Sequence, residues 1–139
     1  MVTTYFKQML AKKMFCANVS GTFNLPSKCY LGLSTSIPTA AGGYTEPATS
    51  GGYARIDLTT NNLLSYNSST GKIYNTGALT FNEATAGWGT VTHYVIFDSA
   101  TRGSGNLLAY GALSSSKSIV TGDIPRVAEN ALQISITDS

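Results

Sequence analysis

The chain has 139 residues, of which 42% are hydrophobic and 12% are charged, and its formal net charge is +2. This length predicts one domain with a core of its own, and the composition excludes a disordered chain, which needs few apolar residues and much charge. Four lysines among residues 1–28, without an arginine cluster, are too few to predict nucleic-acid binding. No apolar run reaches the length of about 18 residues that indicates a membrane-spanning helix.

The pattern of residues 2–15 predicts a helix. Within residues 2–15, four apolar side chains recur at helical spacing, with lysines largely on the other side: Val2, Phe6, Met9 and Leu10. The lysines also argue against a secretory signal peptide. Two interpretations remain open, a helix packed on its own sheet and an arm that contacts a partner subunit through these four residues. Helix-breaking residues follow, through Pro26, so residues 1–28 are predicted to be a helical arm and linker, and residues 29–139 the β-sandwich domain.

From residue 29 onward the pattern changes to short alternating runs separated by turn residues. The predicted strands are 29–34, 53–58, a hairpin or edge region over 61–81, then 89–97, 106–113 and 131–136, with a long loop over 36–52. In the run 53–58, alternation predicts Ala54, Ile56 and Leu58 inward, and it predicts Tyr53, Arg55 and Asp57 outward. The expected fold is all-β, an antiparallel β-sandwich, jelly-roll-like, with a short N-terminal α-helix.

The run 89–97 is predicted to be a central strand, because both of its faces are largely apolar. One expected face carries Val91, His93, Val95 and Phe97, and the other carries Thr92, Tyr94 and Ile96. The turn that begins at Asp98 contains two glycines and predicts a hairpin to the strand 106–113. Trp88, between two glycines at the strand entrance, is expected to cover one open end of the core.

The sequence predicts no catalytic, metal-binding or cofactor-binding residues. A triad of Cys29, His93 and Asp98 can be written, but alternation places His93 and Asp98 on opposite faces, and nothing near Cys29 would lower its thiol pKa. The acidic residues are spread singly, so no glycosidase pair can be nominated. One histidine and two cysteines are too few for a zinc site, and Cys16 and Cys29 are predicted to be free thiols.

The tyrosines of the loops are candidate contacts with a partner. Tyr44 in the long loop, together with Tyr66 and Tyr74 of the hairpin region, could form a platform for carbohydrate. The alternative is that these rings pack on their own sheets or on a neighbouring subunit. Tyr44 is retained as a predicted partner-binding residue.

Several runs together resemble a family of small bacteriophage virion proteins of the tail fibre or head decoration type. The matching runs are Tyr30–Thr39, Gly51–Arg55, Phe81–His93, Ile96–Asp98 and Gly105–Leu113, with a closing run matched by Gly122, Asp123, Arg126, Val127 and Leu132. Pro125 and Glu129–Asn130 depart from the closing pattern, which predicts a bulge or a sheet edge there. The resemblance covers about residues 29–137.

This resemblance implies a non-enzymatic structural protein of the virion, without cofactors. Its expected partners are other phage virion proteins and copies of itself, and neither nucleic acid nor membrane is expected. The first hypothesis is a capsid decoration or cement protein that bridges major capsid subunits through many modest, symmetry-repeated contacts. The alternative is a tail fibre or baseplate component that contributes to tail assembly or to host-surface binding.

Overall fold

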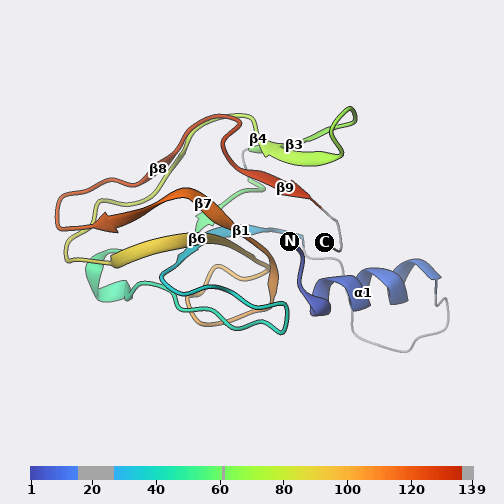
Figure 1. Cartoon of the computed structure of the whole chain (residues 1–139), viewed down its shortest axis with the longest axis horizontal. Coiled ribbons are helices and arrows are strands. Elements are labelled where there is room, and N and C mark those ends of the chain that lie inside the picture. Colours follow the sequence, from blue (N-terminus) through green and yellow to red (C-terminus); the bar gives the residue numbers. More distant parts are fainter. Residues whose placement is uncertain (16–26, 61, 136–139) are drawn as a thin grey trace.

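The computed structural model describes residues 1–15, 27–60 and 62–135, and it is an all-β, sandwich-like fold of antiparallel sheets with one short helix (Figure 1). Cys16 and the helix-ending residues through Pro26 lie outside the described residues. The elements in chain order are α1 (Thr4–Phe15), β1 (Tyr30–Ser34), a 3-10 helix (Thr49–Gly51), β2 (Ile56–Asp57), β3 (Leu64–Asn67), β4 (Lys72–Asn75), β5 (Leu79–Thr80), β6 (Gly89–Phe97), β7 (Leu107–Ile119), β8 (Arg126–Val127) and β9 (Gln133–Ser135).

The largest sheet has four strands in the order β2-β1-β6-β7, and the hairpin of β6 and β7 forms half of it. The register pairs Leu31 with Ile96 and Gly32 with Val95. A three-stranded sheet, β3-β4-β9, and a two-stranded sheet, β5-β8, complete the fold. In Figure 1 the three-stranded sheet lies above the four-stranded one. The long strand β6 is therefore central, as its apolar faces predict.

The main core lies between these sheets. Apolar side chains of the four-stranded sheet meet those of residues 79–88 and 132–134. The group includes Leu31, Leu33, Ile96, Ala109, Leu79, Phe81, Trp88, Leu132 and Ile134. A smaller cluster of Val95, Phe97 and Leu107 occupies the opposite face, where Tyr44 and Tyr110 pack on it. Burying such side chains contributes about 1.5–3 kcal/mol each. The four-stranded sheet is thus covered on both faces.

The alternation predicted for residues 89–97 is wrong at one point. Between the pairs Val91–Lys117 and His93–Ala112, Thr92 faces the stretch 113–116 of β7, so the pairing contains a β-bulge. A bulge changes the face on which the following side chains lie. As a result Val91 packs in the main core with the residues expected on the other face, while Val95 and Phe97 belong to the smaller cluster.

Candidate functional site

The first three residues fix the N-terminus to the outer edge of β7. Val2 forms an antiparallel bridge with Ala109, and its side chain is 3% exposed. The Thr3 amide donates to the Leu108 carbonyl at 2.9 Å, and the Thr3 hydroxyl donates to the Leu107 carbonyl at 2.5 Å. The predicted helix therefore begins at Thr4 rather than at residue 2, because Val2 and Thr3 pair with a strand.

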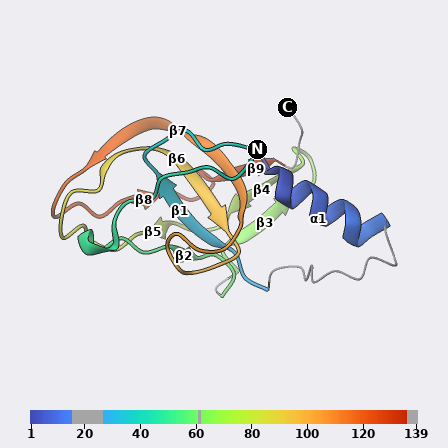
Figure 2. The same ribbon diagram turned by 90° about the horizontal axis from the view of Figure 1, so that it is seen from below.

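Beyond this base, α1 extends away from the sheets (Figures 1 and 2). Phe6 packs against the main core, and its amide donates to the Thr3 hydroxyl at 3.3 Å, which caps the first turn of the helix. Met9 and Leu10 are half-buried, and Phe15 at the far end is 82% exposed. Of the four predicted contact residues of the arm, Val2 and Phe6 thus pack in the chain's own core, whereas Met9 and Leu10 lie on the projecting part of α1.

Tyr44 lies apart from these residues. Its ring packs edge-on against Phe97, with ring centroids 4.8 Å apart and planes at 65°. Phe97 belongs to the smaller cluster, while Val2 and Phe6 belong to the main core on the other face of the sheet. The structure therefore does not bring the five predicted partner-binding residues into one surface, and their role in binding stays a prediction.

A buried ion pair that the sequence analysis missed covers the face of the sheet near Phe97. The Arg55 and Glu46 side chains are 0% and 1% exposed, and Arg55 donates from Nε at 2.9 Å and from Nη2 at 2.8 Å to the two carboxylate oxygens. Arg55 Nη1 donates to the carbonyls of Ser99 and Ser104 at 2.7 and 3.0 Å. The guanidinium carbon lies 3.4 Å from the centroid of the Phe97 ring, a cation–π contact. We name this group the Glu46–Arg55 clamp.

The clamp joins three segments that are distant in the sequence. The Tyr53 hydroxyl donates to Glu46 at 2.7 Å and accepts the Leu33 amide of β1 at 3.0 Å. The Gly103 amide of the β6–β7 turn donates to Glu46 at 3.1 Å. The prediction that Tyr53 and Arg55 point outward is wrong, because β2 contains only Ile56–Asp57 and strand alternation does not extend to the preceding residues. The signal that could have revealed the clamp is a single acid and a single arginine nine residues apart in a chain with little charge.

The electrostatics of the clamp are those of a structural pair. Burial pushes the pKa of Glu46 upward, but hydrogen bonds from Arg55, Tyr53 and Gly103 outweigh it and hold that pKa below its ordinary value. Burial, reinforced by the neighbouring Glu46 carboxylate, raises the pKa of Tyr53. Every charged atom of the pair is therefore satisfied, and Glu46 is a poor acceptor for a catalytic proton.

The triad considered from the sequence is not assembled. His93 is paired with Ser34 at one end of β1, while Cys29 precedes the other end, where Tyr30 pairs with Phe97. Five residues of extended strand separate the two positions by roughly 16 Å. Burial, then the nearby carboxylates of Asp98 and Asp57, raise the pKa of the Cys29 thiol, which is the opposite of what a nucleophile needs.

The other two singled-out residues have structural partners. Asp98 accepts the backbone amide of Asn106 at 2.7 Å and its side-chain amide at 2.9 Å, which closes the β6–β7 turn. Trp88 is 4% exposed, and its indole nitrogen donates to the Gly51 carbonyl at 2.7 Å. Trp88 thus closes one end of the core, as expected from its position. Cys29 forms no disulfide with any described residue, and the prediction for Cys16 concerns a residue outside the described part of the chain.

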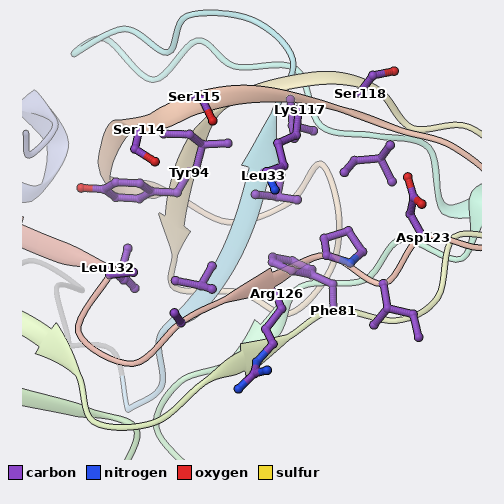
Figure 3. A pocket seen from close by; sticks show the side chains of 18 of the residues that line it. Leu33, Phe81, Tyr94, Ser114, Ser115, Lys117, Ser118, Asp123, Arg126 and Leu132 are labelled. Carbon is purple, nitrogen blue, oxygen red and sulfur yellow. The ribbon is translucent and has the colours of Figure 1, made fainter.

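A cavity of about 700 Å³ opens between β7 and β8 (Figure 3). Its floor is apolar and comes from the main core, with Leu33, Phe81, Val91, Tyr94, Leu113 and Leu132 among its lining residues. Ser114, Ser115 and Lys117 of β7 line one wall, and the segment around β8 lines the other. The cavity could not be predicted from the sequence, because β8 is only two residues long and was not predicted.

The described part of the chain contains no group of three or more side chains suited to hold a metal ion. Within the same residues, no helix combines the length and the apolar character required to cross a membrane. Two features of the described residues are candidate surfaces for contact with other molecules, the projecting part of α1 and the cavity between β7 and β8.

A family model described as Podophage GP4 fiber I protein gp80 matches residues 2–135. No curated protein sequence matches the chain. The family match spans the base of the arm, the clamp and both walls of the cavity.

Proposed function

The chain belongs to the family described as Podophage GP4 fiber I protein gp80, and on this basis we propose that it is a non-enzymatic structural subunit of the phage tail fibre apparatus. The observation that carries the proposal is the match over residues 2–135, which includes α1 as well as the sheets. The clamp supports it, because the most buried charged groups are used to fix loops and not to perform chemistry. The protein would then act in the virion through contacts with other virion proteins and with copies of itself, without nucleic acid, membrane or cofactor.

Within this role, residues 1–28 serve as the arm and residues 29–139 as the body. Met9 and Leu10 of the arm contact a neighbouring virion protein, and the exposed Phe15 extends that surface. Val2 and Phe6 hold the base of the arm on the body, so that the projecting helix has a fixed direction. Tyr44 belongs to a separate contact on the opposite face, around the smaller cluster.

The fibre description of the family favours the tail over the head. Capsid decoration, the first hypothesis from the sequence, requires the protein on the shell, where it would bridge major capsid subunits. Separating tails from DNA-filled heads and quantifying this chain in each fraction by mass spectrometry distinguishes the two locations. We expect the chain in the tail fraction. Recovery with the heads, at a copy number comparable to that of the major capsid protein, would establish decoration instead.

The arm can be tested in the same preparation. A variant with Leu10→Glu and Phe15→Glu should fold normally, since both side chains lie on the projecting helix, yet be missing from purified tails. Ile37→Glu is the matched control, because Ile37 is 75% exposed but lies outside the arm. Normal incorporation of the arm variant would refute the role of the helix while leaving the tail location intact.

A further inference from the structure

The cavity between β7 and β8 lies between two strand edges. β7 is the edge strand of the four-stranded sheet, and residues 1–3 cover its outer edge only around Leu107–Tyr110. Within the described residues, no strand pairs with that edge from residue 111 to 119. β8 is paired with β5 and, in the same part of the chain, with no other strand. Unpaired amide and carbonyl groups at such edges are ready to pair with another strand.

The edge of β7 beside the cavity is long enough for an added strand. The stretch 113–119 of β7 is seven residues long, or roughly 23 Å when extended. The apolar floor between the two edges can accept every second side chain of a strand, because successive side chains point to opposite faces. The exposed rim residues Val120 and Ile124, each 56% exposed, continue this apolar surface.

Charge favours an acidic occupant, because the charged residues that line the cavity are Lys117, Arg126 and Asp123, and the Asp123 carboxylate already accepts the Val120 amide at 2.9 Å. Lys117 extends from β7 into the cavity toward Leu33 (Figure 3), and its ammonium group has no hydrogen bond or ion pair with any described residue. A lysine and a bulge on an edge strand disfavour pairing with an identical strand, which would bring two lysines together. The α1 helix of a second copy is also disfavoured, since it carries Lys7 and Lys12.

We propose that this cavity binds an extended, acidic segment of a different virion protein, which adds to β7 as a strand. Its apolar side chains fill the cavity, and a carboxylate pairs with Lys117. The proposal goes beyond the tail fibre role, because it assigns a second attachment surface that is separate from the arm. It depends on the chain being a virion protein but not on its place in the tail.

A peptide array tests this assignment. Overlapping short peptides that cover all virion proteins of the encoding phage, this chain included, are probed with the full-length protein. We expect binding to peptides that alternate apolar and polar residues and carry net negative charge. With the best peptide bound, the amides of residues 113–118 should become protected from hydrogen exchange, and a proline placed within the peptide should abolish binding.

Two charge variants give the control. Lys117→Glu should weaken binding of the best peptide about tenfold or more, whereas Lys72→Glu, on the exposed side of β4, should leave it unchanged. Both positions are exposed, and thermal unfolding checks that both variants fold. The proposal is overturned if no peptide binds, if the bound peptides are basic, if only peptides of this chain bind, or if both variants bind equally. None of these outcomes changes the expected recovery of the protein with tails.

Discussion

On one face of the four-stranded sheet, the Glu46–Arg55 clamp joins the loop before β2, strand β1 and the β6–β7 turn over Phe97, and the two charges of the clamp are hydrogen-bonded. On the other face, next to β8, the sheet ends in an open cavity, where no described residue pairs with Lys117 and no described strand pairs with the two edges. Both regions contact the same strands, so the difference does not arise from the strands themselves. It arises from whether a loop of the chain returns to cover them.

This difference separates what holds the fold together from what remains available to a partner. Charges taken out of water must be paired and fully hydrogen-bonded, which fixes the loops of the clamp in one arrangement. An open apolar cavity has the opposite consequence, because its walls gain free energy only when another molecule fills it. If the covered region contributes most of the free energy of unfolding, substitutions there should destabilise the protein more than substitutions at the cavity wall.

Breaking the clamp should have the largest effect. Arg55→Met leaves Glu46 buried without its partner, and we expect the free energy of unfolding to fall by about 3–5 kcal/mol. Chemical denaturation monitored by the fluorescence of Trp88 measures this change. Arg126→Met is the matched control, since Arg126 is exposed at the cavity wall, and it should change stability by less than about 0.5 kcal/mol. Equal effects at the two positions would remove the distinction between the regions.

A smaller effect is expected at Asn75, which anchors the chain beside the cavity. Its side-chain amide donates to the carbonyls of Gly77 and Ala128 at 2.8 Å each and accepts the Leu132 amide at 2.9 Å, and the residue is fully buried. Asn75→Ala leaves these groups without partners, which should cost about 2–3 kcal/mol. Asn82→Ala, which removes one exposed bond of 3.3 Å to Gly52, should cost far less in the same denaturation experiment.

Local patterns predicted one long strand in full and another in part. The run 89–97 is β6, whereas the run 106–113 covers only the first part of β7, which continues to Ile119. The hairpin region predicted over 61–81 contains the hairpin of β3 and β4, because apolar alternation and turn residues act over short distances. The suspected phage virion family is confirmed by the family match. The matching runs contain Tyr53, Arg55 and Asp98, which belong to the covered face.

The long-range contacts could not be predicted from local sequence patterns. The partners of Arg55 include Ser99 and Ser104, more than forty positions away, and no local pattern links them. The bulge opposite Thr92 exists because β7 contains extra residues relative to β6, which is visible only in the pairing of the two strands. The cavity likewise depends on how the two-residue strand β8 is placed beside β7, and so short a strand has no periodicity to detect.

Acid should weaken the covered region. The folded-state pKa of Glu46 lies below its ordinary value of 4.5, so its contribution to stability is complete above that pH and is lost as the pH falls through the lower folded pKa. The pKa of Asp57 is also lowered, first by the Thr60 hydroxyl, so the slope of wild-type stability below pH 4.5 has more than one source. Glu46→Gln isolates the clamp, because it keeps the side-chain shape and cannot titrate.

The variant should be less stable at neutral pH and should lose less stability on acidification than the wild type, as measured by denaturation at a series of pH values below 4.5. Asp57→Asn provides the comparison, since Asp57 is paired with Lys28 on the surface and does not contact the clamp. If Glu46→Gln and the wild type lost stability in parallel, the carboxylate would not be held ionised by Arg55 and Tyr53. The contrast between the two faces of the sheet would then rest on packing alone, because the clamp loops would owe their position to Phe97 and Tyr44 and not to the buried charge.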